Sequence, residues 1–408
     1  MSSHHRQEGL WLGADPAPAE VIANPTYNPN APDPHDFSGR VLVDSIHGGN
    51  CIPLQFRQSL ERGNGALDTQ QDFLDAYIRE KDWGANQVAE MLAQKLNLPS
   101  HFRVNIARCL MDFGRFPGET PPGADHLHRF AINDLPARYL RHEQKQSLLH
   151  DCFDATSNTA DEAVHGKLLK IAIHAYDRLN DTGTIRPPVS LIFQPVGYHH
   201  ENRMPYGVFD RMYPDRLAEF TADRRLVARI TLELEKQGIA VAYNHPYLLP
   251  EGSVELRSQV WYFFQYLRKR FEACHPDLFA DPCYERVWEM LLDTNLRNTR
   301  SDQLRSYLHM FRTVPPKMRD HYAQLRQSYE HIGRFLTEQG MEEEYRRWPE
   351  RPSSIVIEIR KDLIWKFADE MCRKPVMTPD GARMEQIDSL TTKLAGAIQT
   401  HLQEDRPL

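Results

Sequence analysis

Several apolar segments of this chain end in side chains that can do chemistry. The clearest case is Val41-Leu42-Val43-Asp44-Ser45, which leads into His47 and the pair Gly48-Gly49. A short apolar run that stops at paired glycines is typical of a buried strand ending in a tight turn. Polar side chains recur in or just after four later apolar segments: Arg108, Asp112 and Arg115; His199, His200 and Glu201; Asn244 and His245; and Glu358.

Together these side chains indicate metal-assisted hydrolysis. Loops at the carboxyl edge of an α/β sheet converge, so they could share one site. Histidines with carboxylates suit zinc, which in catalytic sites has three protein ligands and an open position for water. A bound zinc lowers the pKa of that water, and a carboxylate can take its proton. Arg108 and Arg115 suit a substrate carboxylate, because the guanidinium fork binds it with two hydrogen bonds.

Strand and helix patterns alternate from Gly39 onward. Strands are predicted near 40–46, at the start of 102–118, and at 189–193, 239–243 and 354–359; helices are predicted at 72–95, 159–179, 223–237 and 384–403. Thr159 and Glu162 form the capping-box pattern that opens the second helix. Residues 253–340 show only helical periodicity. The sequence therefore predicts an α/β fold with three α/β/α layers, a mostly parallel central sheet and a helical insertion.

The composition indicates a globular chain with neither a nucleic acid nor a membrane as partner. The chain has 408 residues and a net charge of −7, which disfavours broad nucleic-acid binding. No apolar run approaches the roughly 18–20 residues that span a bilayer. The N-terminus lacks a signal-peptide pattern, and the six cysteines form no C-x-x-C pair. We therefore expect a cytoplasmic protein with an extended arm over 1–38, an α/β domain over 39–252 and 341–408, and a helical insertion over 253–340.

The order of these motifs resembles the N-formylglutamate amidohydrolase family. Ile46-His47-Gly48-Gly49, with Pro53, resembles the family's Pro-His-Ser-Gly turn. The run RCLMDFGRFPG at 108–118 resembles its Arg-x-x-x-Asp-x-Asn-Arg motif, with Gly114 in place of the asparagine. Asn244-His245-Pro246-Tyr247 and Ile357-Glu358-Ile359-Arg360 resemble its Asn-x-Pro-Tyr turn and its late Ile-Glu-Ile-Asn strand. The likeness covers residues 39–250 and 352–400.

The resemblance implies a zinc-dependent amidohydrolase that cleaves a small N-acyl or N-formyl substrate bearing a carboxylate. Asp72 matches an aspartate at a helix start, and His165 matches a helix histidine ahead of the family's third strand. The roles implied are metal ligands His47, Asp72 and His199 or His200; catalytic residues Glu358 (general base), His165 and His245; and substrate-binding residues Arg108, Arg115 and Asn244.

Two departures from the family pattern leave other functions open. The family's third strand ends in Asp-x-His-Ser, whereas Phe193-Gln194-Pro195-Val196-Gly197 is followed by no histidine before His199. The block 253–340 is longer than the family's usual connection, and it could form a lid or an interface between copies of the chain. One alternative is a biosynthetic enzyme that uses the same pocket for a condensation or another acid/base step without metal. The other is a non-catalytic relative that binds a partner.

Overall fold

The computed structural model describes residues 16–31, 37–60, 71–125, 128–180, 182–201, 210–278, 280–295, 297 and 299–405. The chain divides into two compact units. Unit 1 consists of residues 1–193, 222–248 and 353–408, and unit 2 consists of residues 194–221 and 249–352. Unit 2 therefore contains residues 194–221, 249–252 and 341–352 in addition to the block 253–340.

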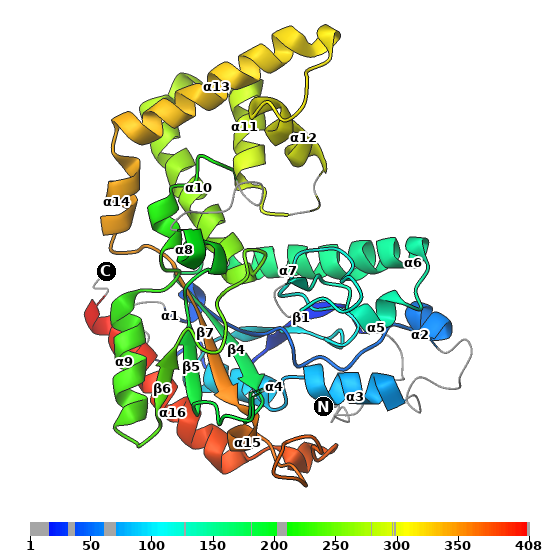
Figure 1. Cartoon of the computed structure of the whole chain (residues 1–408). Coiled ribbons are helices and arrows are strands. Elements are labelled where there is room, and N and C mark those ends of the chain that lie inside the picture. Colours follow the sequence, from blue (N-terminus) through cyan, green and yellow to red (C-terminus); the bar gives the residue numbers. More distant parts are fainter. Residues whose placement is uncertain are drawn as a thin grey trace. The chain divides into compact units, whose positions relative to one another are not determined.

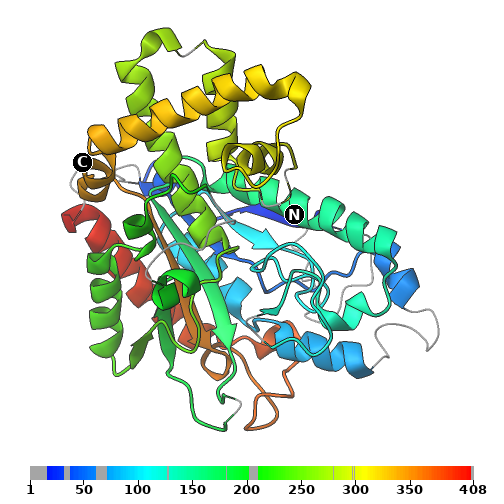
Figure 2. The ribbon, with the colours of Figure 1, turned by 45° about the horizontal axis from the view of Figure 1, so that its top comes forward.

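Unit 1 is built on a seven-stranded sheet, shown in Figures 1 and 2. Its strands are β1 (Ala19–Ala23), β2 (Val41–Ser45), β3 (Ser100–Val104), β4 (Leu169–Tyr176), β5 (Val189–Ile192), β6 (Val241–Tyr243) and β7 (Ser353–Arg360). Their order across the sheet is β1-β3-β2-β4-β7-β5-β6. The pairs β2–β3, β2–β4, β4–β7 and β5–β6 are parallel, whereas β1–β3 and β5–β7 are antiparallel. The prediction of a mostly parallel sheet is confirmed.

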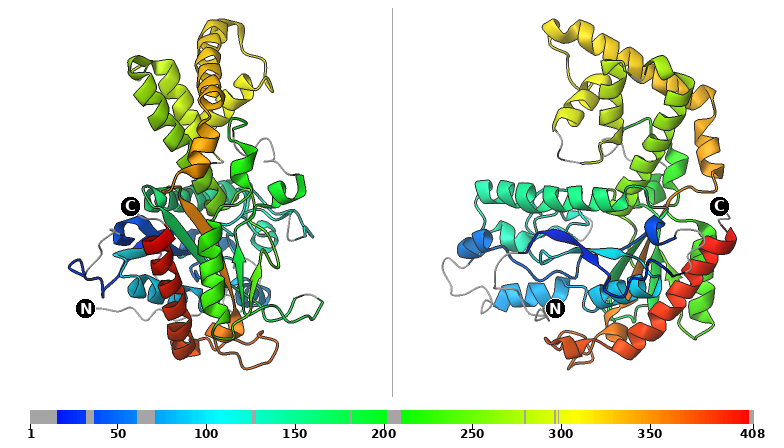
Figure 3. Two further views of the ribbon diagram at one scale, coloured as in Figure 1. Left: turned by 90° about the vertical axis from the view of Figure 1, so that its left-hand side faces the viewer. Right: turned by 180° about the vertical axis from the view of Figure 1, so that it is seen from behind.

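Helices cover both faces of this sheet. α4 (Ala85–Lys95) packs on β2 and β4, and α16 (Met384–Thr400) packs against α4 and α9 (Arg224–Glu235). α7 (Ala155–Val164) packs against β1 and β3 on the opposite face, as Figure 1 and the right-hand view of Figure 3 show. The predicted three-layer α/β/α fold is confirmed. The remaining α-helices of unit 1 are α1 (Phe37–Arg40), α2 (Leu54–Leu60), α3 (Gln71–Glu80), α5 (Asp134–Ala137), α6 (His142–Ser147) and α15 (Lys361–Ile364).

The central strands carry polar side chains inside the sheet. β2, β4 and β5 are buried over their whole length, and β7 is buried up to Ile359. Lys170 Nζ on β4 lies 2.5 Å from Asp44 Oδ2 on β2, and each side chain is 1% exposed. The register places His174 of β4 beside Glu358 of β7. Buried charges need partners, and for Lys170 the parallel neighbour β2 supplies one.

Two helices predicted from the sequence differ from the structure. The predicted helix 159–179 is wrong at its start and beyond Val164, because α7 spans Ala155–Val164, with Thr159 inside it, and β4 begins at Leu169. Gly166, with a φ of 77°, ends that helix in the left-handed conformation that glycine favours. The predicted helix 72–95 is two helices, α3 and α4, separated by residues 81–84. Residues 19–23 of the predicted arm form the edge strand β1.

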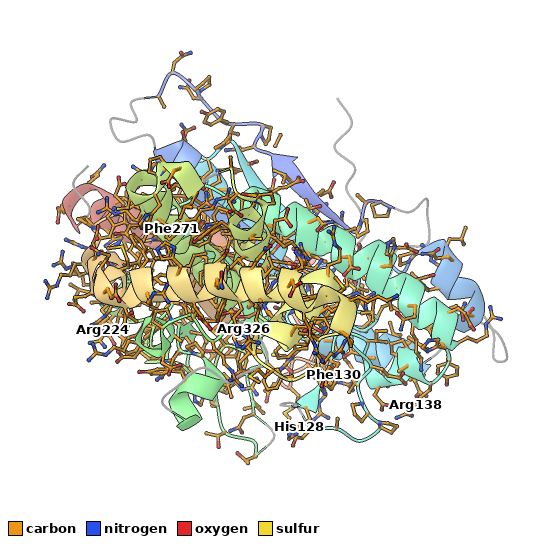
Figure 4. All side chains as sticks on the ribbon, turned by 90° about the horizontal axis from the view of Figure 1, so that it is seen from above. His128, Phe130, Arg138, Arg224, Phe271 and Arg326 are labelled. Carbon is orange, nitrogen blue, oxygen red and sulfur yellow. The ribbon has the colours of Figure 1, made fainter. Side chains whose placement is uncertain are left out.

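Unit 2 is helical. Its α-helices are α8 (Val196–Glu201), α10 (Val254–Cys274), α11 (Pro282–Leu292), α12 (Thr299–Leu308), α13 (Arg319–Glu338) and α14 (Met341–Arg347). The Ser253 side chain caps α10 by accepting a hydrogen bond from the N–H of Leu256. Phe271, labelled in Figure 4, lies in the apolar core of this unit, where its ring centroid is 5.7 Å from that of Trp288. Among the described residues, no helix combines the length and the apolar character needed to cross a membrane.

Candidate active site

His47 lies just beyond the carboxyl end of β2 and is buried, with 5% of its surface exposed. The two glycines after it are required by close packing. A Cβ at Gly48 would lie 2.0 Å from Asn86 Oδ1, and one at Gly49 would lie 2.3 Å from the carbonyl oxygen of Ile106. The chain therefore turns tightly against its neighbours directly after His47.

Asp82 approaches His47 from the connection between α3 and α4. Its N–H donates to the carbonyl oxygen of His47 at 3.1 Å. Its carboxylate is buried, with Oδ2 3.5 Å from His47 Nδ1 and Oδ1 accepting a hydrogen bond from Arg108 Nη1 at 3.3 Å. Gly84, with a φ of 87°, allows the chain to turn from this connection into α4.

β4 and β7 supply two further members of the site. His174 Nδ1 lies 3.0 Å from His47 Nδ1 and 3.2 Å from Asp82 Oδ2. His47, Asp82 and His174 each offer one ligand atom, and these atoms all lie within 4.8 Å of one another. We call these three residues the His/Asp/His cluster. Glu358 Oε1 lies 3.9 Å from His174 Nδ1 and is buried beside the cluster.

Asp112 binds the other nitrogen of the His47 ring. Its Oδ1 accepts from His47 Nε2 at 2.8 Å and from the N–H of Gly114 at 3.0 Å. Its Oδ2 accepts from Arg108 Nε at 3.1 Å and lies 3.8 Å from Arg115 Nε. Because a carboxylate can only accept, the proton of His47 lies on Nε2. The lone pair of Nδ1 then points to the cluster, as in carboxylate–histidine–metal sites.

Burial and ion pairing set the charge states of the site. Burial and Arg108 lower the pKa of His47, but Asp112 and Asp82 outweigh them, so the pKa of His47 is raised. Burial acts to raise the pKa of each aspartate. The interactions of Asp82 with His174 and His47, and of Asp112 with Arg108 and His47, hold both pKa values well below the usual range. Burial raises the pKa of Glu358 to about 7. Glu358 can therefore exchange a proton near neutral pH.

The donor atoms of the site fit a divalent metal ion. Among the described residues, Asp82 Oδ2 and both carboxylate oxygens of Glu358 are buried without a hydrogen-bond partner. Such atoms are costly to bury unless something else satisfies them. The two Nδ1 atoms of His47 and His174 face each other at 3.0 Å. Two imidazole nitrogens and one carboxylate oxygen are ligand types that zinc takes in catalytic sites, so the His/Asp/His cluster could hold such an ion.

Of the site residues predicted from the sequence, His47 lies in this cluster, and Glu358, Arg108 and Arg115 lie directly beside it or in contact with its partners. The structure does not bring Asp72 there. Asp72 lies in the first turn of α3, exposed, in a polar pocket that Arg138 also lines. Asp82, ten residues further on, takes the place in the cluster that the prediction gave to Asp72.

The predicted histidines lie elsewhere. His165 caps α7 and shares a cavity with Val41 and Leu42 at the amino end of β2, whereas His47 follows the carboxyl end. His245 is exposed beyond β6. His199 and His200 belong to α8, and their side chains lie outside the described residues.

Asn244 holds a turn at the end of β6. It has a φ of 50°, and its Oδ1 accepts a hydrogen bond from the N–H of Phe193 at 3.0 Å. Its own N–H donates to the carbonyl oxygen of Leu191 at 2.9 Å. These bonds give Asn244 a structural role in joining the ends of β5 and β6.

The sequence predictions missed His174 and Asp82. His174 stands in LKIAIHAY at 169–176, an eight-residue run with β-branched residues that follows Gly166 and has the length of a strand. Asp82 stands before Trp83-Gly84, and a glycine inside a helical pattern is a breaker signal. The family pattern has a histidine at the end of its third strand, which the sequence predicts at residues 189–193. In the structure, a histidine near the carboxyl end of a strand is present on β4.

The fold and the site define an α/β protein with a buried His/Asp/His cluster toward the carboxyl edge of a mostly parallel sheet, and an arginine–aspartate network behind it. The position agrees with the general rule for ligand sites in such sheets.

Comparison with known proteins gives the family. The model of the N-formylglutamate amidohydrolase family matches residues 39–259, more than half of the chain, so the chain belongs to this family. Its membership indicates an amidohydrolase-like function. A comparison with curated proteins found no match.

Two solved structures are similar over most of the chain. One is a gene product from Agrobacterium tumefaciens, 14% identical, covering 89% of this chain and 91% of its own, with a TM-score of 0.42. The other is N-formylglutamate amidohydrolase from Ralstonia eutropha, 13% identical, covering 94% of this chain and 98% of its own, with a TM-score of 0.44.

Proposed function

We propose that this protein is a metal-dependent amidohydrolase with zinc held by His47, Asp82 and His174. The observation that carries the proposal is the buried convergence of three ligand atoms from these residues within 4.8 Å of one another. When bound, zinc would polarise an amide carbonyl and lower the pKa of a water molecule. The three protein ligands would leave the open position that a catalytic zinc needs.

Glu358 is the proposed general base. It lies beside His174, its carboxylate oxygens have no hydrogen-bond partner among the described residues, and burial raises its pKa to about 7. A base with a pKa near the working pH both exists in the right form and transfers a proton readily. Glu358 would take the proton of the attacking water and pass it to the nitrogen of the leaving amine as the C–N bond breaks.

The charge balance of the site supports an anionic substrate. The carboxylates of Asp82 and Asp112 balance the guanidinium groups of Arg108 and Arg115. His47 and His174 would bind the ion as neutral imidazoles. The two positive charges of a divalent ion would then exceed the single negative charge of Glu358, so the site would be positive. Arg108 is engaged by both aspartates, and we propose that Arg115 contacts a substrate carboxylate. The substrate class is then a small N-acyl or N-formyl compound that bears a carboxylate.

Matched pairs of variants test the proposal. His174→Ala and Asp82→Asn should lose zinc and hydrolysis, whereas His245→Ala and Asp72→Asn should keep both. Zinc is measured by mass spectrometry after stripping with a chelator and reloading. Hydrolysis is followed as amine release from N-formyl and N-acetyl amino acids, with and without a side-chain carboxylate, and circular dichroism checks folding.

Two results would refute the proposal. Equal zinc content in all four folded variants would show that the cluster is not the metal site. Full hydrolytic activity in metal-free wild-type protein would show that no metal is needed. If the metal-free protein catalysed a condensation or another non-hydrolytic reaction, the alternative of a biosynthetic acid/base enzyme would be favoured.

A further inference from the structure

The connection between α12 and α13 carries the densest group of exposed apolar side chains in the described part of the chain. Met310, Phe311 and Met318 are 76%, 63% and 42% exposed, and the other eight exposed large apolar side chains among the described residues all lie in unit 1. We call residues 309–318, together with Arg319 at the start of α13, the α12–α13 loop; Figures 1 and 2 show it in yellow, leading into the N-terminal end of α13. Exposed apolar side chains grouped in this way are a candidate interaction surface.

The same loop is cationic. Arg312, Lys317 and Arg319 are all exposed, and among the described residues no carboxylate lies in an ion pair with them. Asp320 is the one acid that follows directly. Because the whole chain has a net charge of −7, this positive loop departs from the chain's average and favours an anionic partner.

Hydrogen bonds hold the loop in place. The N–H of Phe311 donates to the carbonyl oxygen of Ser306, and the N–H of Met318 donates to that of Pro315, each at 2.9 Å. At the start of the loop, His309 Nε2 lies 3.2 Å from Oδ2 of the buried Asp210. The apolar side chains are therefore presented by an ordered backbone, so binding would cost little further ordering.

The ring of Phe311 also carries a cation. The guanidinium of Arg211 lies 4.9 Å from its centroid, which places a positive group against an exposed aromatic face. Apolar and cationic groups thus alternate over a few residues. Such a surface suits the boundary between lipid headgroups and acyl chains, where apolar side chains enter and cations stay at the level of the phosphates.

We propose that the α12–α13 loop binds the surface of an anionic lipid bilayer. A specific protein interface buries about 800 Å² on each partner, which is more than three side chains provide, whereas peripheral insertion needs only a few. The proposal departs from the expectation, drawn from the sequence, that no membrane is a partner, because that expectation rested on a search for spanning segments, which does not detect a short loop. The proposal is independent of the chemistry proposed for the His/Asp/His cluster.

Vesicle flotation of the full chain tests the proposal. The protein should bind vesicles of mixed phosphatidylcholine and phosphatidylserine, less so at high salt, and should not bind phosphatidylcholine alone. The double variant Met310→Ser with Phe311→Ser should abolish binding. Changing Arg312 and Lys317 to glutamate should weaken binding by more than about fivefold at each site, because each change removes a cation and adds an anion. Matched controls outside the loop are Met384→Ser, at a side chain 47% exposed, and Lys374→Glu.

Three results would overturn the proposal. The first is an absence of binding to the anionic vesicles. The second is an equal loss of binding in the control variants. The third is self-association of the wild type in sedimentation velocity that the Phe311→Ser change dissolves, without vesicle binding, because the loop would then be a protein interface.

Discussion

Replacing Asp112 by asparagine tests whether this carboxylate orients His47 and neutralises Arg108. The asparagine keeps the shape but offers one acceptor and one donor group where the carboxylate offered two acceptors. It can accept from His47 Nε2, which lies 2.8 Å away, or from Arg108 Nε at 3.1 Å. In either orientation its NH₂ group faces a donor, so the variant cannot satisfy both partners.

Two effects of different size follow from that geometry. Breaking a buried ion pair on one side costs about 3–5 kcal/mol of the free energy of unfolding, and Asp112 is 2% exposed. Losing the partner of a metal-binding histidine lowers metal affinity by about 10–100-fold. The pKa of His47 should also fall, because Asp112 raises it in the wild type.

Urea unfolding measures the first effect, and zinc titration against a competing chelator measures the second. Asp134→Asn is the control, because Asp134 pairs with Arg138 at the same i, i+4 spacing but on the surface. That change should leave both the urea midpoint and the zinc affinity close to those of the wild type, because exposed ion pairs contribute little to stability. An Asp112→Asn protein with wild-type stability and wild-type zinc affinity would refute the role given to Asp112.

Three further changes probe other parts of the structure. Glu358→Gln should retain zinc and lower kcat by about 10²–10⁴-fold, measured on the zinc-loaded protein; unchanged kcat would exclude Glu358 as the base. Gly114→Ala should weaken zinc binding, because the added Cβ would lie 3.3 Å from His47 Nε2, whereas Gly396→Ala, with nothing within 4 Å, should not. Burial acts to raise the pKa of Asp210, but His309 and Tyr329 outweigh it, so the pKa is lowered. The unfolded chain therefore binds more protons, and this part of the stability is lost as pH falls below about 3.9. Asp210→Asn should show a smaller difference between urea midpoints at neutral and acidic pH, and an unchanged difference would contradict the reasoning.

The sequence predicts well where the signal is local. The apolar run before His47 ends at two glycines; a Cβ at Gly49 would clash with the backbone of Asn105 and Ile106, and one at Gly48 would displace the side chain of Asn86. The strand that carries Glu358 is similarly clear, because Ile355, Val356, Ile357 and Ile359 form a nearly continuous apolar run. Such runs are typical of strands buried on both faces.

The sequence predicts poorly where a buried strand contains charged residues. β4 has Lys170 and His174 among its apolar residues, and the spacing of Leu168, Leu169, Ala172 and Tyr176 also matches a helix. What decides between the two is the partner of each polar group. Lys170 pairs with Asp44 on β2, more than a hundred residues earlier in the chain. No local pattern contains that information.

The two candidate aspartates illustrate the same limit. Asp72 stands at a helix start, a position that favours a carboxylate through the helix dipole. Asp82 lies in a connection whose path depends on the N–H of Asp82 bonding to His47 O and on the turn at Gly84. The distance between two loops, and not a residue preference, decides which aspartate meets His47.

The order of the strands has a consequence for folding during synthesis. β7 comes last in the chain but lies between β4 and β5 in the sheet. Until the ribosome has released residues 353–360, β4 and β5 have no strand between them, and two central edges stay open to mispairing. The same eight residues bring Glu358 to His174. A chain that stops before β7 can therefore neither close its sheet nor place the proposed base beside His174.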